Sequence, residues 1–482
     1  MLSYDMSERG NASRYDYLYR RIRHDIAHGN ILPDEKLPSK RALALNLGVS
    51  VITVEAAYAQ LIAEGYVRAE ERRGYFACEL SPVARGGRRE GERLRGDAGR
   101  AGAPEGNLTT PSPASGSASG SAATAATASA ATTFFPYQTW ARVMRRTLTE
   151  ESSATLAEAA LGAGSPRLRQ AIAAYLREYR GMDVPAERIV VAAGSQTLYQ
   201  LIIQLLGRDR GFAIESPGYP LLERMYEAQG VHCASIPLAA GGIDVAALCK
   251  SGASVAHVMP AHQFPTGVVM SAAHRRDLLN WSRADEAAFA GAKGGEHCGR
   301  FIVEDDYDAE FRMSGRPIAP LASVDTAGRV IYLNSFTKSL GAAFRIAYMA
   351  LPEDLAAQFD LNLGFYSNTV SPLEQLALAR FIEKGYYERH VNRLRTHAKR
   401  TQDAVVEKLK TDCASGSLAF TGLDGGFHFS VRLEAKGTLS YADVERDFLR
   451  SAHECGVRVS AIDEVGRYLV NYEQAIVQGG LR

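Results

Sequence analysis

The sequence predicts an α/β protein built from a small head, a linker and a large body, and three observations support this prediction. From Thr109 to Thr133 every residue is Ala, Ser, Thr, Gly or Pro, a composition typical of a linker. Before this stretch, apolar residues at helical spacings are followed by two short strand-like runs. After it, apolar strand-like runs end in turns, and some lead into helical patterns, which is typical of a mostly parallel sheet.

The composition is that of an ordinary globular protein. Hydrophobic residues make up 46% of the 482 residues and charged residues 23%, and roughly 150 residues per domain suggests about three units. The net charge of +1 excludes a global basic field, so binding to nucleic acid requires a local patch. None of the six cysteines forms a CxxC pair, which argues against a zinc module and a disulfide framework. We expect no metal, no membrane span and a cytoplasmic location, since the chain lacks long apolar runs and an apolar signal core.

The linker is predicted to cover residues 80–133. Its first half is rich in Arg and Gly, and neither half has the apolar periodicity needed to offset the entropy lost on folding. As a flexible coil, about 50 residues span roughly 40 Å root-mean-square. The chain thus divides into a head at residues 1–79, the linker, and a body at residues 134–482.

The head has the pattern of three helices followed by a hairpin. Apolar residues spaced by four indicate a helix at Tyr15–Ile26. A second helix is expected between Ser39, its N-cap, and Gly48. A third helix begins after Ser50 and stops at Gly65.

The hairpin consists of two short strands, Tyr66–Ala69 and Tyr75–Cys78, around a turn at residues 70–74. Three helices and such a hairpin form a winged helix-turn-helix. In this geometry the second helix of the pair enters the major groove of DNA, and the wing tip meets the phosphates or the minor groove.

The head resembles the GntR family of bacterial regulators over nearly its whole length, through the segments LPSKRALALNLGVS, AAYAQLIAEGY and RGYF. The resemblance implies that six residues face a double-stranded DNA operator: Arg41, Ser50, Thr53, Arg72, Arg73 and Gly74. Val51 and Glu55 stand where members of the family carry Arg, and residues 1–78 of the head have 11 Lys and Arg against 10 Asp and Glu. We therefore expect weak binding per head, helped by a second head or by the Arg-rich start of the linker. A winged helix that makes only protein contacts is the alternative.

Two segments of the body are typical of a site for a flat, phosphorylated ligand. In the first, a β-branched strand meets Gly194 and then a helix, whose N-terminus can cradle a phosphate. In the second, Tyr219 follows a strand at the edge where ligands bind in open α/β sheets, and it can stack on a heterocycle. Either feature alone is also typical of ordinary packing.

A third segment places three carboxylates, Glu304, Asp305 and Asp306, at the end of a strand and before Tyr307. Three adjacent carboxylates suit a metal ion as well as a protonated ring nitrogen, but no histidine is adjacent to them. A carboxylate opposite a pyridine nitrogen keeps that nitrogen protonated and makes the ring an electron sink.

The fourth segment follows another strand and contains Ser335, Thr337 and Lys338, with Arg345 seven residues after the lysine. A lysine at a buried strand end can form a Schiff base. The two hydroxyl groups and Arg345 would then hold a phosphate. Together the four segments predict a site for pyridoxal 5′-phosphate.

The body resembles fold-type I aminotransferases and, within them, the MocR/GabR group of regulators. The matching segments are PAHQFPTG at 260–267, EDDYDAEF at 304–311 and SFTKSL at 335–340. The resemblance implies that Lys338 forms the internal aldimine, that Asp305 faces the pyridine nitrogen and that Tyr307 faces the phenolic oxygen. The other residues that it implies in cofactor binding are Tyr219, Gly194, Ser195, Gln196, Ser335, Thr337 and Arg345.

Two assignments stay open at this point. His262 or Gln263 replaces the ring contact that an Asn makes in aminotransferases, or merely caps a turn. A carboxylate-binding arginine is expected near the C-terminus; Arg467 is the best candidate, and Arg458 and Arg482 are rivals.

The resemblance implies a homodimeric, PLP-dependent DNA-binding transcriptional regulator. It would sense a small amine or amino acid by aldimine exchange at Lys338 and reposition the DNA-binding heads. Two alternatives remain: an active aminotransferase with an appended DNA-binding module, and a sensor of the cofactor itself that controls vitamin B6 synthesis.

Overall fold

A computed structural model describes most of the head and the body. The described residues are 4, 6, 13–70, 73–80, 130–157, 162–284, 299–313, 318–413, 417–435, 440–463 and 466–477. Arg72, Arg482 and residues 81–129 of the predicted linker therefore lie outside the described part. No described helix is both long enough and apolar enough to cross a membrane.

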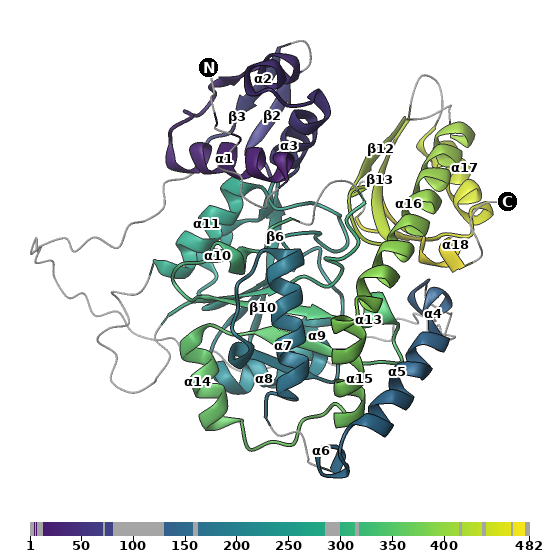
Figure 1. The fold of residues 1–482 in the computed structure, drawn as a ribbon. Helices are drawn as coiled ribbons and strands as arrows, with labels where there is room; N and C mark the ends of the chain where they lie inside the picture. Colours follow the sequence, from purple (N-terminus) through teal and green to yellow (C-terminus); the bar gives the residue numbers. More distant parts are fainter. Residues whose placement is uncertain are drawn as a thin grey trace, which may run out of the picture.

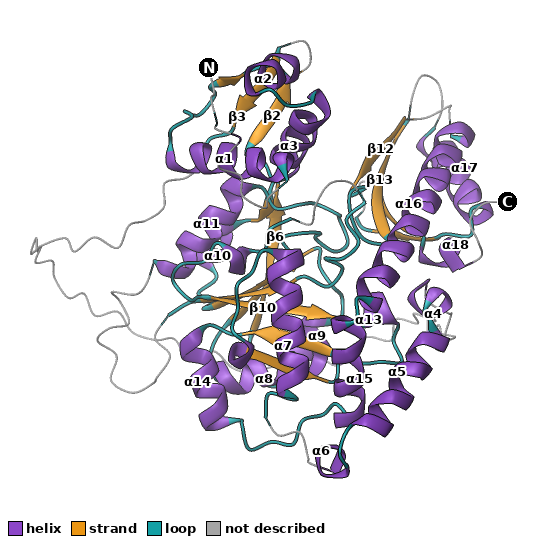
Figure 2. Cartoon of the chain, viewed as in Figure 1, coloured by secondary structure: helices purple, strands orange, loops and turns teal. Residues whose placement is uncertain are grey.

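The head forms three helices and a three-stranded sheet (Figures 1 and 2). The helices are α1 (Arg14–His28), α2 (Lys40–Leu47) and α3 (Val51–Ala63), and the strands run in the order β1 (Lys36–Leu37), β3 (Gly74–Ala77), β2 (Val67–Glu70). The expected caps are present: Ser39 and Ser50 each accept a hydrogen bond from a backbone N–H in the first turn, and Gly48 ends α2 in the left-handed conformation. The strand β1 was not predicted, because two residues are too few to show alternation.

The large domain of the body is built on an eight-stranded sheet. The strand order is β4 (Ile189–Ala192), β11 (Ala347–Ala350), β10 (Val330–Ser335), β9 (Phe301–Asp305), β8 (Val255–Val258), β5 (Phe212–Ser216), β6 (Cys233–Ala239), β7 (Gly242–Ile243). The five strands β10, β9, β8, β5 and β6 are parallel, whereas β11 runs antiparallel to both of its neighbours and β7 runs antiparallel to β6. The expectation of a mostly parallel sheet is confirmed.

Helices cover both faces of this sheet (Figure 2). One face packs on α8 (Ser195–Leu206) and α14 (Glu353–Asn362), and the other on α7 (Pro166–Tyr175) and α15 (Pro372–Glu383). The remaining helices of the large domain are α5 (Tyr137–Glu150), α6 (Ser153–Ala157), α9 (Leu222–Glu227), α10 (Val245–Lys250), α11 (Ala272–Arg283) and α13 (Thr337–Leu340). The strands β4, β8, β9 and β11 are buried at every position, so the carboxyl ends of the strands carry the accessible chemistry.

A small domain ends the chain. Its antiparallel sheet has the order β12 (Ser417–Thr421), β13 (His428–Glu434), β15 (Arg467–Asn471), β14 (Arg458–Ala461), and it packs on α16 (Tyr386–Asp412), α17 (Tyr441–Glu454) and α18 (Glu473–Val477). The short helix α4 (Ala130–Phe134) also belongs to this core, where Ala130 is fully buried. Residues 130–133, which the sequence analysis assigned to the linker, therefore lie in a helix of the body, because a buried alanine cannot be distinguished from a linker alanine by composition.

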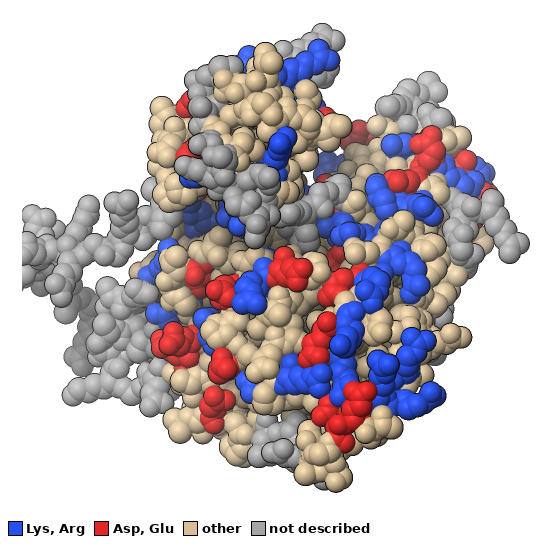
Figure 3. Space-filling view, viewed as in Figure 1, with Lys and Arg blue, Asp and Glu red and all other residues tan. Residues whose placement is uncertain are grey.

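The head rests on the body beside α11, near the top of the view in Figure 1. The backbone N–H of Ala272, at the start of α11, donates a hydrogen bond to the carbonyl of Glu64 at the end of α3 (2.9 Å), and Arg276 donates to the carbonyl of Ala27 (3.2 Å). On the face shown in Figure 3, acidic and basic side chains are interspersed over the body, in keeping with the low net charge.

Candidate cofactor site

Three strand ends bring a glycine, a serine and an arginine to one edge of the large sheet. In the ladder β4–β11–β10, Ala192 pairs with Ala347, which pairs with Ser335. Gly194 lies two residues after Ala192, and Arg345 lies two residues before Ala347 on the antiparallel strand. Register alone therefore places these side chains together, although they are far apart in the sequence.

Gly194 and Arg345 form a cradle that admits no extra side chain. A Cβ atom on Gly194 would lie 2.9 Å from Nη2 of Arg345, and Gly194 has a φ of +84°. Arg345 itself has a positive φ of 47°, a costly conformation for a residue with a side chain. Gly194 begins α8 without a side-chain cap, so N–H groups of the first turn remain free beside the guanidinium group. This combination suits a phosphate.

The hydroxyl groups after β10 lie next to each other. Ser335 Oγ donates to Thr337 Oγ1 (2.8 Å) and accepts a hydrogen bond from the Thr337 N–H (3.1 Å). Ser195, in the first turn of α8, is half-buried and Gln196 is exposed. The hydroxyls hold the turn that leads into α13, which carries Lys338.

The three adjacent carboxylates have different partners, because side chains alternate along a strand. Glu304 accepts two hydrogen bonds from the backbone N–H groups of Leu321 (2.7 Å) and Ala322 (2.9 Å). Asp306 accepts a hydrogen bond from the Tyr332 hydroxyl (2.9 Å) and pairs with the buried Arg180. Both acids are therefore held by structural contacts. Burial raises the pKa of Glu304 to about 7.

Asp305 points to the opposite face of the sheet from Glu304, where it meets two polar side chains, Tyr199 and His257. The hydroxyl of Tyr199 donates to Asp305 Oδ2 (2.7 Å), and His257 Nε2 lies 3.5 Å from the same oxygen. The other ring nitrogen of His257 is hydrogen-bonded to the hydroxyl of Tyr226 (2.7 Å). The carboxylate is buried, with 6% of the residue exposed, and it lies at the end of the central strand β9. These partners fix its orientation, as a group that faces a ring nitrogen requires.

Tyr307 and the loop at residues 260–270 meet beside Asp305. The Tyr307 hydroxyl donates to the His262 carbonyl (3.0 Å), and His262 Nδ1 is hydrogen-bonded to Asp308 Oδ2 (2.7 Å). Gln263 caps the turn of this loop, because its Oε1 accepts hydrogen bonds from the N–H (3.2 Å) and the hydroxyl (2.6 Å) of Thr266. Of the two residues left open by the sequence, Gln263 is therefore the turn cap, and His262 lies in the polar cluster.

His262, Asp308 and His428 form a buried cluster whose ligand-type atoms lie within 4.8 Å of one another. Around a tetrahedral zinc ion, two ligand atoms are about 3.3 Å apart. The 2.7 Å between His262 Nδ1 and Asp308 Oδ2 is shorter and is the length of a hydrogen bond. Burial, followed by the nearby His262 and Lys338, holds the pKa of His428 well below its usual value, so His428 is neutral. No metal is expected here, as in the sequence analysis.

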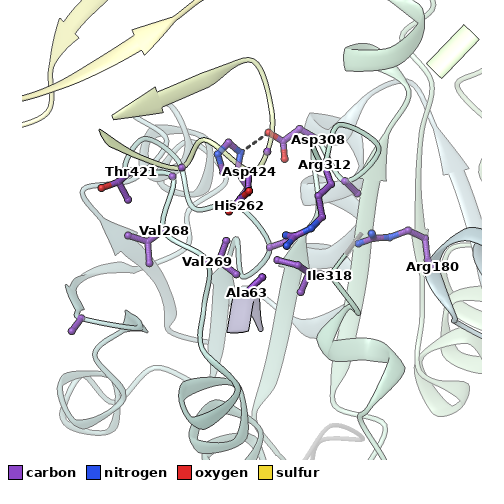
Figure 4. Close-up of a pocket in the computed structure, with 16 residues that line it drawn as sticks. Ala63, Arg180, His262, Val268, Val269, Asp308, Arg312, Ile318, Thr421 and Asp424 are labelled. Carbon is purple, nitrogen blue, oxygen red and sulfur yellow. Dashed lines mark hydrogen bonds and ion pairs between the residues drawn. The ribbon is translucent and has the colours of Figure 1, made fainter. Parts of the chain in front are cut away.

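A cavity of about 340 Å³ adjoins this cluster (Figure 4). Its lining includes Ala63 from the head, His262 and Arg312 from the large domain, and Thr421 from the small domain. All three units of the chain therefore meet at one cavity beside the site.

Lys338 projects from α13 and lies next to an acid that the sequence analysis did not single out. Its Nζ is 3.4 Å from Oε2 of Glu473, the first residue of α18. The pair is separated by 135 residues, and no spacing rule connects a helix of the large domain to the last helix of the small domain. Tyr219 is half-buried after β5, with its ring edge-on to Phe264 (6.2 Å between centroids).

Arg467 does not have a free guanidinium group. Its Nε donates to Asp463 Oδ2 (2.6 Å), and its backbone N–H donates to Oδ1 of the same residue (3.1 Å). In the β13–β15 ladder, Arg467 pairs with Arg432, and Asn471 pairs with His428 of the polar cluster. Arg467 therefore lies four residues, or roughly 13 Å, along the strand from the residue that faces His428. The rival Arg458 lies at the exposed start of β14. The sequence pattern did not indicate that Asp463 pairs with Arg467.

Among the described residues of the head, those expected to face DNA include few cations without an ion-pair partner. Arg41 is exposed on α2, Ser50 uses its hydroxyl to cap α3, and Thr53 is half-buried beside it (2.8 Å between the hydroxyls). Arg73 pairs with Glu70, and Gly74 has a φ of +117° at the wing turn.

Lys40 pairs with Glu55, one of the two residues that depart from the family pattern. The local charge is therefore nearly balanced, in line with the even count of acids and bases in the head.

The arrangement of the body site fits pyridoxal 5′-phosphate. The cradle of Gly194 and Arg345 matches a phosphate, the buried carboxylate of Asp305 matches a ring nitrogen, and Lys338 supplies an amine for the aldehyde. When bound, the cofactor supplies an aldehyde carbon that bonds reversibly to primary amines and a ring that withdraws electrons.

Comparisons with known proteins agree with this division of the chain. Residues 130–471 match the family model for aminotransferase class I and II, and residues 14–76 match the model for bacterial regulatory proteins of the gntR family. An uncharacterized HTH-type transcriptional regulator, YhdI of Bacillus subtilis (strain 168), is 31% identical over 89% of this chain and 85% of its own length. The probable rhizopine catabolism regulatory protein MocR of Rhizobium meliloti is 31% identical over 78% of this chain and 73% of its own length.

Among solved structures, the chain is similar to a multiple substrate aminotransferase from Thermococcus profundus. The identity is 26% and the TM-score 0.56, over 72% of this chain and 86% of the other. The chain therefore belongs to the aminotransferase class I and II family and, within it, to the HTH-type transcriptional regulators that join a GntR-type head to a body that binds pyridoxal 5′-phosphate.

Proposed function

We propose that this chain is a transcriptional regulator that binds operator DNA through its head and responds to a small amine or amino acid at Lys338. The effector amine takes the place of the lysine amine at the cofactor's aldehyde carbon. Phosphate binding by Gly194, Ser195, Gln196, Ser335, Thr337 and Arg345, stacking by Tyr219 and ring contacts from Asp305 and Tyr307 form part of this proposal.

One observation carries the proposal: the loop that contains His262 also leads to the surface on which the head rests. The loop is closed by a hydrogen bond from the Met270 N–H to the Pro260 carbonyl (2.8 Å). Two residues later, the N–H of Ala272 donates to Glu64 of the head. A change at His262 is therefore linked to the head by ten residues of chain and the hydrogen bond from Ala272 to Glu64.

The size of the change in head position depends on how differently the effector binds the two arrangements of the head. An effector shifts the position of the head only if it binds one arrangement better than the other. A nearly complete switch requires a preference of about 10⁴-fold, or about 5.5 kcal/mol. A preference of this size needs the effector to make or break several contacts and not only the bond at Lys338.

The test is a titration of the cofactor-loaded full-length chain with a panel of amino acids and amines, read in the visible spectrum and by binding to an operator fragment. We expect one class of compound to shift the absorption band stably and to change DNA affinity at the same concentrations. Lys338→Ala should abolish the borohydride-reducible link to the cofactor and the DNA response. Lys384→Ala, which changes an exposed lysine after α15, should preserve both.

Two outcomes contradict the proposal. Release of a keto acid over many turnovers, without any change in DNA affinity, indicates an aminotransferase with an attached head. A reducible cofactor adduct in Lys338→Ala shows that another amine holds the cofactor. Arg41→Ala separates the two functions, since it should weaken DNA binding and leave the spectrum unchanged.

A further inference from the structure

In the ion pair between Lys338 and Glu473, the acid is held in place by its own backbone contact and is largely buried. Glu473 begins α18 directly after β15, and its backbone N–H donates to Oδ1 of Asn471 (3.0 Å). Its side chain is 16% exposed, against 37% for Lys338. Within the described part of the chain, each is the other's only ion-pair partner.

Among the described residues, Glu473 is the carboxylate that lies within ion-pair distance of Lys338. Burial, followed by His262 and Lys338, lowers the pKa of His428 well below its usual value. Asp308, the acid in the cluster with His428, is hydrogen-bonded to His262 Nδ1 (2.7 Å).

We infer that Glu473 is a positioning residue that holds the ammonium group of Lys338 after an effector amine has displaced it. The inference rests on the proposed function, because it requires amine exchange at the cofactor's aldehyde carbon. In that exchange, a bond forms from the carbon to the effector nitrogen and the bond to Lys338 Nζ breaks. The effector enters as an ammonium ion and gives up a proton, and Lys338 leaves as an ammonium ion, so protons and charge balance.

The position of Glu473 has a consequence for the exchange equilibrium. It favours the effector-bound state over the resting state, because the released ammonium group gains a carboxylate partner. Glu473 thus stabilises the effector complex, as a sensor requires.

A double-mutant cycle tests the inference, with n-butylamine as the probe and the visible spectrum of the cofactor-loaded full-length chain as the readout. In Glu473→Gln, the half-saturating butylamine concentration should rise about two- to fivefold, the effect of one partly exposed ion pair. The rise should shrink at high salt. Glu454→Gln, which removes another ion pair of the small domain, with Lys408 (3.0 Å), should have no effect.

The decisive comparison uses the Lys338→Ala background. Because Glu473 acts through the lysine, Glu473→Gln should then change the half-saturating concentration by less than twofold. If the same rise persists without the lysine, Glu473 contacts the effector directly and the inference is wrong. If Glu473→Gln has no effect in either background, the ion pair between Lys338 and Glu473 does not stabilise the effector-bound state, and the inference is also wrong.

A second measurement needs neither effector nor cofactor. In the cofactor-free chain, Lys338 should react several-fold faster with succinimidyl acetate in Glu473→Gln than in the native protein or in Glu454→Gln, as measured by peptide mass spectrometry. The contact between the lysine nitrogen and the carboxylate, 3.4 Å in length, must break before the nitrogen can attack the reagent, and an uncharged amide holds the nitrogen less strongly. An unchanged labelling rate overturns the inference. If amines leave the native spectrum unchanged, the proposed function fails; if the spectrum responds but the labelling rate does not change, only the inference about Glu473 fails.

Discussion

At the residue scale, the three neighbouring acids of β9 show what a sequence motif leaves undecided. The run Glu304, Asp305, Asp306 indicates a carboxylate at a strand end, and the choice of Asp305 came from the family resemblance. The structure supplies a physical reason for this choice: the two flanking acids accept structural hydrogen bonds, whereas Asp305 faces Tyr199 and His257. The alternation of side chains along β9 predicts that Asp305 points to the opposite face of the sheet from Glu304 and Asp306. It does not predict which of the two faces holds the ligand.

Glu215, near the end of β5, predicts a pH dependence of stability. Its Oε2 accepts a hydrogen bond from the Met259 N–H (3.1 Å), and its Oε1 is buried as well. Burial raises its pKa from 4.5 to about 7. Between these values the folded state binds more protons than the unfolded state, so stability falls as pH rises through this window. The loss is complete above pH 7 and amounts to about 3 kcal/mol.

Glu215→Gln removes this titration and retains a carbonyl oxygen for Met259. We expect the variant to gain stability relative to the native chain at pH 8 and to lose most of that gain at pH 5. Urea unfolding of the cofactor-free chain at the two pH values measures the difference. Glu434→Gln, at the exposed end of β13, is the control and should follow the native profile. Parallel profiles for Glu215→Gln and the native chain would show that Glu215 is not the source of the pH dependence.

Residue contacts between domains were the part of the site that the sequence could not predict. Lys338 was found from its strand and from Arg345, which are local features. Its partner Glu473 comes from the small domain, and the two residues are brought together where α4 packs on both α13 and α18. The partner of Arg467 is only four residues away, but Asp463 lies in a turn before β15, and that turn gives no periodic signal.

At the element scale, local chemistry predicted the helices of the head well. Serines at the N-caps and glycines in the left-handed conformation determine where α2 and α3 lie, because they satisfy backbone groups that the helix leaves free. The hairpin strands are shifted by one residue, to Val67–Glu70 and Gly74–Ala77, since pairing partners determine the ends of a strand. The residues of α4 have linker composition, and only packing on the small domain distinguishes them.

The pairing of α2 with α3 predicts how DNA affinity can be raised. Glu55 of α3 pairs with Lys40 of α2 on the face expected to meet DNA, so the lysine is neutralised there. Glu55→Gln should free Lys40 for a phosphate contact. The affinity for an operator fragment should then rise at low salt, and the slope of log K against log salt concentration should steepen by about 0.9.

Fluorescence anisotropy over a range of salt concentrations measures this slope. Glu79→Gln makes the same change in net charge at an exposed position outside α2 and α3, and it is the matched control. If both variants steepen the slope equally, the effect comes from net charge and Glu55 does not shield Lys40. An unchanged slope for Glu55→Gln would place Lys40 away from the phosphates.

At the scale of the whole molecule, the head, the large domain and the small domain meet around the cavity beside His262 (Figure 4). The sequence predicted the head and the mostly parallel sheet of the body, because each has its own pattern, but it did not separate the small domain from the rest of the body. It did not predict how head and body pack together, since the contacts between them use backbone groups, such as the N–H of Ala272 and the carbonyl of Glu64, that every residue carries. The proposed coupling of the head to the site would therefore depend on backbone geometry.

Two glycines of the head allow this docking to be tested with a matched control. Gly65 and Gly29 both follow helices with positive φ values, 73° and 78°, so an alanine causes similar backbone strain at each. A Cβ atom on Gly65 would lie 3.0 Å from Cβ of Ser271 on the body, whereas a Cβ on Gly29 would meet nothing within 4 Å. Gly65→Ala should therefore push the head from the body, and Gly29→Ala should only destabilise the head by about 1–2 kcal/mol, the cost of a side chain in the left-handed conformation.

The measurement is hydrogen exchange at the N-terminus of α11, where the N–H of Ala272 is bonded to Glu64. We expect exchange in a peptide containing Ala272 to be at least several-fold faster in Gly65→Ala and unchanged in Gly29→Ala. The effector-dependent change in DNA affinity should weaken in the first variant alone, because a head that is not docked cannot follow the site. Equal exchange in both variants would show that the head leaves the body freely in the native chain, and regulation would then require a route other than this docking surface.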